Sequence, residues 1–198
     1  SEGGNAVADV LFGKKNPSGR LPFTIAKALD DYPMHHLGLY DPDNAGEVVY
    51  GEGIYVGYRW FDKMDIEPQF PFGYGLSYTD FEFGEPSADR KSIKEDGKIR
   101  IRVPVRNVGK REGSAVVQLY AHRTGASQVD RPERELKDFG KISLAPGEKG
   151  TVELELPAEA LRWYDEASGC WRVEKGDYEA QLGTSSRDLF ASIPFAVK

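Results

Sequence analysis

The second part of the chain alternates apolar and polar residues in short segments, most clearly in residues 98–107, KIRIRVPVRN. Successive side chains of a strand point to opposite faces of a sheet, so this pattern predicts a half-buried antiparallel strand. The predicted buried face carries Ile99, Ile101, Val103 and Val105, and the predicted outer face carries Arg100, Arg102 and Arg106. Pro104 has no backbone N–H to donate, which indicates an edge strand or a bulge.

The same alternation recurs in other segments of this region, and turns rich in Gly, Pro, Ser and Asn separate them. These segments are SYTDFEF (77–83), SAVVQLYAHR (114–123), ELKDFGKISL (135–144), GTVELEL (150–156), the short pair RWYD (162–165) and CWRV (170–173), GDYEAQLG (176–183) and LFASIPFAV (189–197). They predict a mainly β fold over residues 76–198, an immunoglobulin- or fibronectin III-like antiparallel β-sandwich of about seven or eight strands. The loop of residues 123–135, RTGASQVDRPERE, is long enough to carry a binding site, although the sequence indicates no ligand for it.

The first 29 residues carry a different and shorter pattern. Apolar residues recur at helical spacing from Asn5 to Phe12, where Asn5 can cap a helix and Gly13 can end it. A turn then leads to LPFTI (21–25), which is predicted to be a short strand. Its apolar face has no obvious cover within residues 1–75. Residues 30–49 show no sustained period and are predicted to be irregular surface chain.

Aromatic residues concentrate between these two regions, because eleven of the 23 in the chain lie within residues 50–83. Aromatic rings bury large areas, and the glycines among them let the backbone bend or another segment approach closely. Pro68 and Pro71 restrict the backbone around Phe70 and Phe72, which favours an extended path. Residues 30–75 are therefore predicted to form an extended loop and aromatic junction.

Composition narrows the possible partners. The chain has 198 residues, a hydrophobic content of 39% that suits a globular core, and a formal net charge of -6. A protein that binds a phosphate backbone needs a basic face, so nucleic acid is not expected as a partner. Residues 1–75 hold six basic and eleven acidic residues, whereas residues 76–198 hold twenty and twenty-one. The arginine row is interpreted as a solvated outer face or a dock against the acidic first region, with anion recognition as the alternative.

Cys170 is the only cysteine, so no internal disulfide can form. Its position beside Trp171 predicts a small core residue rather than a nucleophile. No run of apolar residues approaches the roughly eighteen needed to span a membrane, so no membrane partner is expected. The first residues show no signal-peptide pattern, and the compartment stays open.

Two groups of polar residues in the irregular region are of types that can bind a metal ion or catalyse glycoside hydrolysis. His35 and His36 with Asp31, Asp41 and Asp43 could hold a metal ion, since imidazole and carboxylate groups are natural ligands. Neighbouring histidines on an extended segment point to opposite sides, which favours a solvated loop with one packed histidine. No metal is therefore expected.

The second group consists of the carboxylates Asp41, Asp43, Glu47 and Glu52. Glycoside hydrolysis uses two carboxyl groups held about 5–9.5 Å apart, so the residue type would permit that chemistry. No apolar pattern surrounds any of them that would raise the pKa of one carboxyl, and a solvated charge run is the favoured interpretation.

The glycines of GEGIYVG (51–57) superficially resemble a dinucleotide-binding loop. The last interval is one residue too long and no helical pattern follows, so no nucleotide cofactor is expected. The aromatic residues nearby, Tyr55, Tyr58, Trp60 and Phe61, could stack on sugar rings or pack the junction, and packing is the favoured interpretation.

Three motifs carry a resemblance to a known family: GGNAVADVLFGKKNPSGRLPFT (3–24), YGEGIYVGYRWFD (50–62) and FPFGYGLSYTDFEF (70–83). Weaker motifs follow in VRNVGKREGSAVVQLY (105–120), RPERELKDFGKISLAPGE (131–148) and GDYEAQLGTSSRD (176–188). In this order they resemble the C-terminal portion of family 3 glycoside hydrolases, the β-glucosidase and β-xylosidase group that carries a fibronectin type III-like domain. The resemblance covers nearly the whole chain.

The resemblance implies that residues 1–29 are the last strip of an α/β sandwich lobe, most of which would lie before Ser1. It implies a retaining parent enzyme that needs no cofactor and releases a terminal sugar, glucose first among candidates, from an oligosaccharide or β-glucoside. In that family the nucleophilic Asp belongs to a barrel domain and the acid/base Glu to lobe sequence ahead of residue 3. No catalytic residue is therefore expected here, and the barrel and lobe of the parent are the expected partners.

Two alternatives stay open beside this structural role. The chain could be a non-catalytic carbohydrate-binding or adhesion module, or one half of a split enzyme. Because it begins inside a family motif, its start is expected to be an artificial, cleavage or gene-split boundary. Burial of the aromatic rings between segments would favour the junction, whereas an exposed coplanar row of three rings would favour sugar binding.

Overall fold

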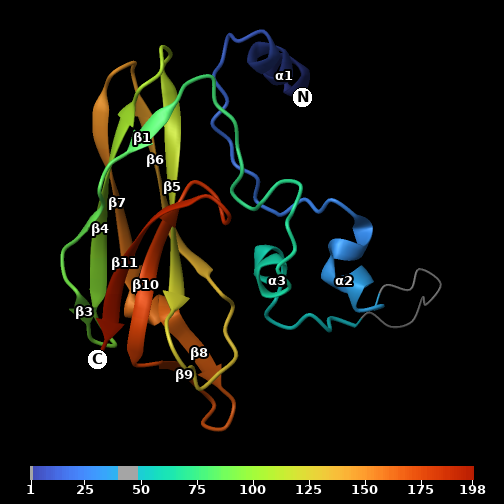
Figure 1. Ribbon diagram of the computed structural model, residues 1–198, viewed down its shortest axis with the longest axis vertical. Helices are drawn as coiled ribbons and strands as arrows, with labels where there is room; N and C mark the ends of the chain where they lie inside the picture. Colours follow the sequence, from blue (N-terminus) through green and yellow to red (C-terminus); the bar gives the residue numbers. More distant parts are fainter. Residues whose placement is uncertain (1, 40–48) are drawn as a thin grey trace.

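The computed structural model describes residues 2–39 and 49–198, and it contains a β-sandwich with the N-terminal region beside it (Figure 1). The first sheet runs β1 (Phe81–Phe83), β4 (Lys98–Asn107) and β2 (Ser87–Ala88), with β7 (Lys149–Pro157) also paired to β4. The second sheet runs β3 (Ser92–Ile93), β11 (Leu189–Val197), β10 (Gly176–Gly183), β5 (Gly113–Arg123) and β6 (Glu135–Leu144). The predicted mainly β sandwich is confirmed. The short strands β2 and β3 were not predicted, and β3 pairs with β11 in parallel.

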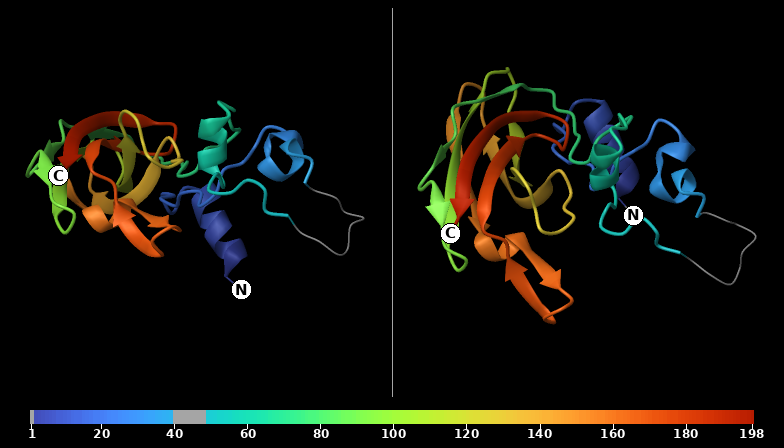
Figure 2. Two further views of the ribbon diagram at one scale, coloured as in Figure 1. Left: turned by 90° about the horizontal axis from the view of Figure 1, so that it is seen from below. Right: turned by 60° about the horizontal axis from the view of Figure 1, so that its bottom comes forward.

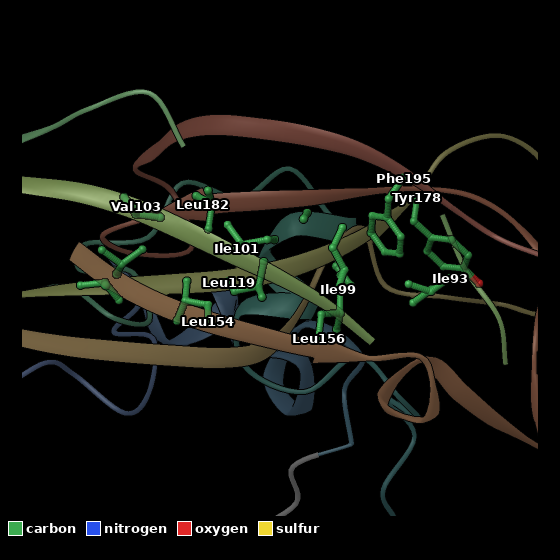
Figure 3. Close-up of a cluster of buried hydrophobic side chains, with 14 of the residues drawn as sticks. Ile93, Ile99, Ile101, Val103, Leu119, Leu154, Leu156, Tyr178, Leu182 and Phe195 are labelled. Atoms are coloured by element: carbon green, nitrogen blue, oxygen red, sulfur yellow. The ribbon is translucent and has the colours of Figure 1, made fainter. Parts of the chain in front are cut away.

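The alternation of residues 98–107 places the core as predicted. The inward side chains of β4, Ile99, Ile101, Val103 and Val105, are at most 2% exposed. They pack with apolar side chains of β7 and of the second sheet, including Leu119, Leu154 and Leu182 (Figure 3). Tyr178 and Phe195 stack at one end of the core with their ring centroids 5.6 Å apart. One continuous apolar core therefore lies between the two sheets.

Pro104 lies inside β4 and not in an edge strand or a bulge. On one side β4 pairs with β7 along its whole length. On the other side it pairs with β1 from residue 105 onward and with β2 at residues 101–102, so Pro104 lies between these two short strands. The Pro104 carbonyl accepts a hydrogen bond from the Gly84 N–H at 2.9 Å on this side. The N and C=O of one strand residue point to the same side, so the missing N–H falls in the gap between β1 and β2.

The N-terminal region consists of short helices. α1 (Gly3–Leu11) overlaps the predicted helix and has no buried residue, but Asn5 lies inside it and Glu2 stands at its N-cap, so the prediction that Asn5 caps the helix is wrong. The prediction of irregular chain over residues 30–49 is wrong near its start, where the 3-10 helix η1 (Leu29–Asp31) and α2 (Pro33–His36) form. α3 (Tyr58–Lys63) begins directly after Gly57, so the prediction that no helix follows the glycines is also wrong. Gly57 has a φ of 59°, a backbone conformation that favours glycine and redirects the chain into the helix.

The predicted strand LPFTI pairs with the aromatic segment. The Leu21 N–H donates to the Tyr74 carbonyl at 2.9 Å, and the Ile25 N–H donates to the Phe70 carbonyl at 2.8 Å. The pairing is too irregular for a strand and leaves one β-bridge, between Ile25 and Phe70. These bonds attach the first region to the junction.

After β7, the 3-10 helix η2 (Ala158–Leu161) leads into a hairpin of β8 (Arg162–Asp165) and β9 (Cys170–Val173). The hairpin is a separate two-stranded sheet that projects away from the sandwich (Figure 2). Both strands were predicted, but Cys170 is exposed and the prediction that it is a core residue is wrong. Only the base of the hairpin reaches the core, through Leu161 and Val173, so Cys170 near its tip has no apolar interior to enter.

Candidate functional site

Three rings of the aromatic segment form a second, smaller core. Tyr55, Trp60 and Phe61 are 8%, 4% and 1% exposed. Tyr32 lies edge-on to Phe61 with ring centroids 6.0 Å apart, and His36 lies edge-on to Trp60 at 5.4 Å. Edge-to-face pairs of this kind add to the free energy of burial. The cluster holds α3 against η1 and α2.

Other rings of the segment reach the sandwich. The hydroxyl of Tyr58 accepts a hydrogen bond from the Leu136 N–H at 2.8 Å. The ring of Tyr58 lies 5.0 Å from that of Phe72 and 5.9 Å from that of Tyr120 on β5. The Tyr55 hydroxyl donates to the Asp130 carboxylate in the long loop between β5 and β6. α3 therefore lies between the sandwich and α2, in contact with both (Figures 1 and 2).

Asp62 on α3 is a buried carboxylate between two arginines of the sandwich. Its side chain is 2% exposed, and its oxygens lie 3.2 Å from Nε of Arg187 and 3.5 Å from Nη1 of Arg134. Burial raises the pKa of Asp62, and the two guanidinium groups oppose that shift. Arg187 also donates to the carbonyls of Phe61 and Ile66, both at 3.0 Å. One arginine thus binds the carboxylate and the C-terminal end of the same helix.

The turn between β10 and β11 is hydrogen-bonded to the last residues of the junction. The Ser186 N–H donates to the Phe72 carbonyl at 2.9 Å, and the Ser186 carbonyl accepts from Arg134 at 3.0 Å. Gly73, with a φ of 85°, passes so close to Gln118 that an added Cβ would lie 2.3 Å from that side chain. A glycine is required there by both backbone conformation and space.

A second buried carboxylate, Glu174, fixes the long loop of residues 123–135. Its side chain is 5% exposed and lies 3.3 Å from Nε of Arg123 and 3.0 Å from Nε of Arg131. The Gln128 N–H and the Ser127 hydroxyl donate to it at 2.7 and 2.8 Å. Burial opposes the charge, but these donors outweigh it and lower the pKa of Glu174. The loop predicted as a possible binding site is thus tied to the strand ends.

Of the five residues considered as metal ligands, the structure describes Asp31, His35 and His36. Asp41 and Asp43 lie outside the described residues. His35 and His36 lie in the helical turn α2, not on an extended segment, and His36 packs on Trp60. Within residues 2–39 and 49–198, no three His, Cys, Asp or Glu side chains are placed to hold a metal ion.

The proposed carboxylate pair is equally unsupported by what is described. Asp41, Asp43 and Glu47 lie outside the described residues, and Glu52 is half-buried. The strongly buried acid of the junction, Asp62, is shielded from solvent by its neighbours. A catalytic carboxyl must touch its substrate, so Asp62 has the position of a structural ion.

The arginine row forms ion pairs across the first sheet. Arg100 lies 3.3 Å from Glu155, and Arg102 lies 2.9 Å from Glu153 on the neighbouring strand β7. This face is solvated, as one of the two favoured interpretations predicted. In the described part of the chain, no helix is long and apolar enough to cross a membrane.

Comparison with known protein families finds a match for two segments of the chain. Residues 1–58 match the glycosyl hydrolase family 3 C-terminal domain, and residues 115–186 match the fibronectin type III-like domain. The chain is 41% identical to beta-glucosidase BoGH3A of Bacteroides ovatus, over 98% of this chain and 26% of that protein. It is 45% identical to thermostable beta-glucosidase B of Acetivibrio thermocellus, over 94% and 24%.

Solved structures of β-glucosidases superpose on nearly the whole chain. The beta-glucosidase of Kluyveromyces marxianus superposes with a TM-score of 0.88 at 42% identity, over 98% of this chain and 23% of that one. DesR, a beta-glucosidase of Streptomyces venezuelae solved with D-glucose, superposes with a TM-score of 0.90 at 37% identity, over 99% and 25%. The chain therefore spans about a quarter of the length of these relatives.

Solved β-glucosidases thus share the fold of this chain over nearly its whole length. The chain belongs to glycoside hydrolase family 3, as a C-terminal segment.

Sequence reasoning identified the rings of the junction but missed its charges. The sequence contains one indication that Asp62 is buried, because it directly follows the two large rings of Trp60 and Phe61. Arg134 stands in a loop with several charges and Arg187 in a polar turn, where nothing distinguishes them from solvated residues. Their role depends on the fold.

Proposed function

We propose that this chain is the structural C-terminal part of a retaining β-glucosidase-like enzyme that removes terminal sugars from oligosaccharides or β-glucosides. Both catalytic carboxyl groups come from the remainder of that enzyme, its barrel and α/β lobe. The likeness to β-glucosidases over nearly the whole chain supports this proposal. The chain supplies the sandwich and the junction that attaches it.

The observation that carries the proposal is the apolar surface of the N-terminal region. Val7, Leu11, Phe12, Phe23 and Leu29 are each between 55% and 82% exposed. A contiguous domain rarely leaves so many large apolar side chains in water, and such surfaces are typical of protein contacts. The remainder of the α/β lobe is the partner that would cover them.

We divide the chain by role into a lobe strip (1–29), a loop and aromatic junction (30–75) and a sandwich (76–198). The rings of the junction contact both neighbours, because the cluster of Tyr55, Trp60 and Phe61 packs against Ala26 and the ring of Tyr58 lies edge-on to Tyr120. This supports a division in which the middle part has a structural role and fixes the orientation of the sandwich.

The test is a hydrolysis assay of the purified chain on an aryl β-glucoside. We expect no turnover above a heat-denatured control, because the proposal places both catalytic carboxyl groups in the remainder of the enzyme. The whole protein, assayed beside it, should be active. Turnover by the chain that disappears in Glu47→Gln or Glu52→Gln would contradict the proposal, because it would place a catalytic acid in residues 40–52.

A further inference from the structure

Two exposed aromatic residues lie side by side on the β8–β9 hairpin. Tyr164 and Trp171 face each other across the two strands, with ring centroids 5.5 Å apart. They are 50% and 63% exposed, whereas Tyr55, Trp60 and Phe61 of the junction are at most 8% exposed. Large apolar rings held in water on a projecting hairpin are typical of binding surfaces.

A cleft lies beside this hairpin. It has a volume of about 610 Å³ and is enclosed by β8, by residues 129–135 of the long loop and by Ile54 and Arg59 of the junction. This volume lies within the roughly 300–1,000 Å³ of typical small-ligand sites. Glu174 fixes the loop through Arg131, so this wall of the cleft is held in place before any ligand arrives.

The charges around the cleft nearly cancel. Its walls carry three arginines, Arg59, Arg131 and Arg162, and four carboxylates. A phosphate or an acidic peptide would need an excess of basic groups, and a basic ligand would need an excess of acids. The balance favours a neutral ligand that offers both hydrogen-bond donors and acceptors.

Two of these polar groups are available to a ligand. Glu166 makes no hydrogen bond or ion pair with any described residue. Arg162 lies 3.6 Å from Glu159 with both side chains well exposed, a type of surface pair that contributes little. A pyranose presents apolar ring faces and hydroxyl edges, which match an aromatic ring beside a free carboxylate and a guanidinium.

We propose that the cleft binds a neutral saccharide, with one sugar ring packed on Trp171 or Tyr164 and its hydroxyls directed toward Glu166 and Arg162. This proposal does not depend on the proposed function. It would hold a sugar chain on the surface of the protein without cleaving it.

The test is a titration of the 198-residue chain with cellotetraose, followed by tryptophan fluorescence. Trp60 is 4% exposed, so a ligand-dependent signal reports on Trp163 and Trp171. We expect saturable binding with a Kd in the millimolar range, on the order of 1 mM. Trp171→Ala should weaken it at least tenfold, and Glu166→Gln several-fold. Phe139→Ala is the matched control, because Phe139 is an exposed ring, 66% accessible, on β6 outside the cleft.

Absence of saturation up to about ten times the expected Kd would overturn the proposal. So would equal affinity in the wild type and Trp171→Ala. Thermal unfolding of each variant, measured in parallel, separates lost binding from lost structure. Tyr164→Ala provides a second test if Trp171→Ala does not fold.

Discussion

Asp62 is the residue on which the charges of the junction converge. Neither of its carboxylate oxygens has a hydrogen-bond donor among the described residues, and the nearest charges are those of Arg134 and Arg187. Burial raises the pKa of Asp62 above its ordinary 3.8, the arginines oppose this, and Glu133 adds to the rise. The ionised form is therefore less favourable in the folded chain than in the unfolded chain, so stability should depend on pH.

The sign of this dependence follows from proton binding. Between pH 3.8 and the raised pKa, the folded chain holds a proton on Asp62 and the unfolded chain does not. The contribution of Asp62 is complete below that window and is lost as the pH rises through the folded pKa. We expect the free energy of unfolding of the wild type, relative to that of Asp62→Asn, to fall as the pH rises through this window. Urea unfolding monitored by tryptophan fluorescence at several pH values measures this difference.

Asp62→Asn retains all other carboxyl groups, so their titration cancels when its free energy of unfolding is subtracted from that of the wild type. A difference that rises with pH would show that the two arginines dominate and that the pKa is lowered. A difference that does not change with pH would show that Asp62 does not titrate abnormally. Either result would contradict the interpretation of Asp62 as a carboxylate whose burial outweighs its ion pairs.

At the scale of elements, residues 70–74 join the three parts of the chain. Their backbone bonds to Leu21 and Ile25 on one side and to Ser186 on the other. Phe72 packs on Tyr58, and Tyr74 lies 5.0 Å from Phe70. This short segment therefore contacts the lobe strip, α3 and the sandwich, although it belongs to no regular strand.

Removing a ring from this segment should destabilise the junction. Phe72 and Tyr74 are half-buried, so we expect Phe72→Ala or Tyr74→Ala to cost about 1–3 kcal/mol, less than the roughly 3–5 kcal/mol of a fully buried phenylalanine. Thermal unfolding of the chain measures this loss, and Tyr50→Ala, at an exposed ring that is 79% accessible, is the control.

The same variants distinguish packing from sugar stacking when they are made in the whole enzyme. Packing predicts a lower Tm with little change in KM for the glucoside. An unchanged Tm with a raised KM would contradict the structural role, because it would show that these rings contact the substrate.

At the scale of the whole molecule, the N-terminal and C-terminal parts of the chain differ in how much apolar surface they bury. The sandwich contains the main core, whereas α1 buries no residue and the large apolar side chains of the lobe strip lie in water. A domain must bury enough apolar surface to offset its conformational entropy, and only the sandwich does so.

Limited proteolysis should therefore cut the N-terminal region first. We expect early cleavage within residues 1–39 and a resistant fragment that begins near Leu76 and retains residues 98–197. Mass spectrometry of the fragments and a cooperative melt of the isolated 76–198 sandwich provide the measurement. Early cuts inside β4, β5 or β10 with an intact N-terminal region would show that stability is distributed in the opposite way.

The sequence alone determined the sandwich, because alternation over several strands leaves one register in which most of their apolar side chains face the core. It also marked the junction, because rings and glycines concentrate there. The tertiary structure decided how the junction is held, since Asp62, Arg134 and Arg187 are distant in sequence and meet only after the sheets pair. It also decided which rings face water: Trp60 entered the small core, whereas Trp171 was left on a hairpin that reaches past the core. Local patterns specify local structure, but burial of a charge or exposure of a ring depends on which distant segments fold against it.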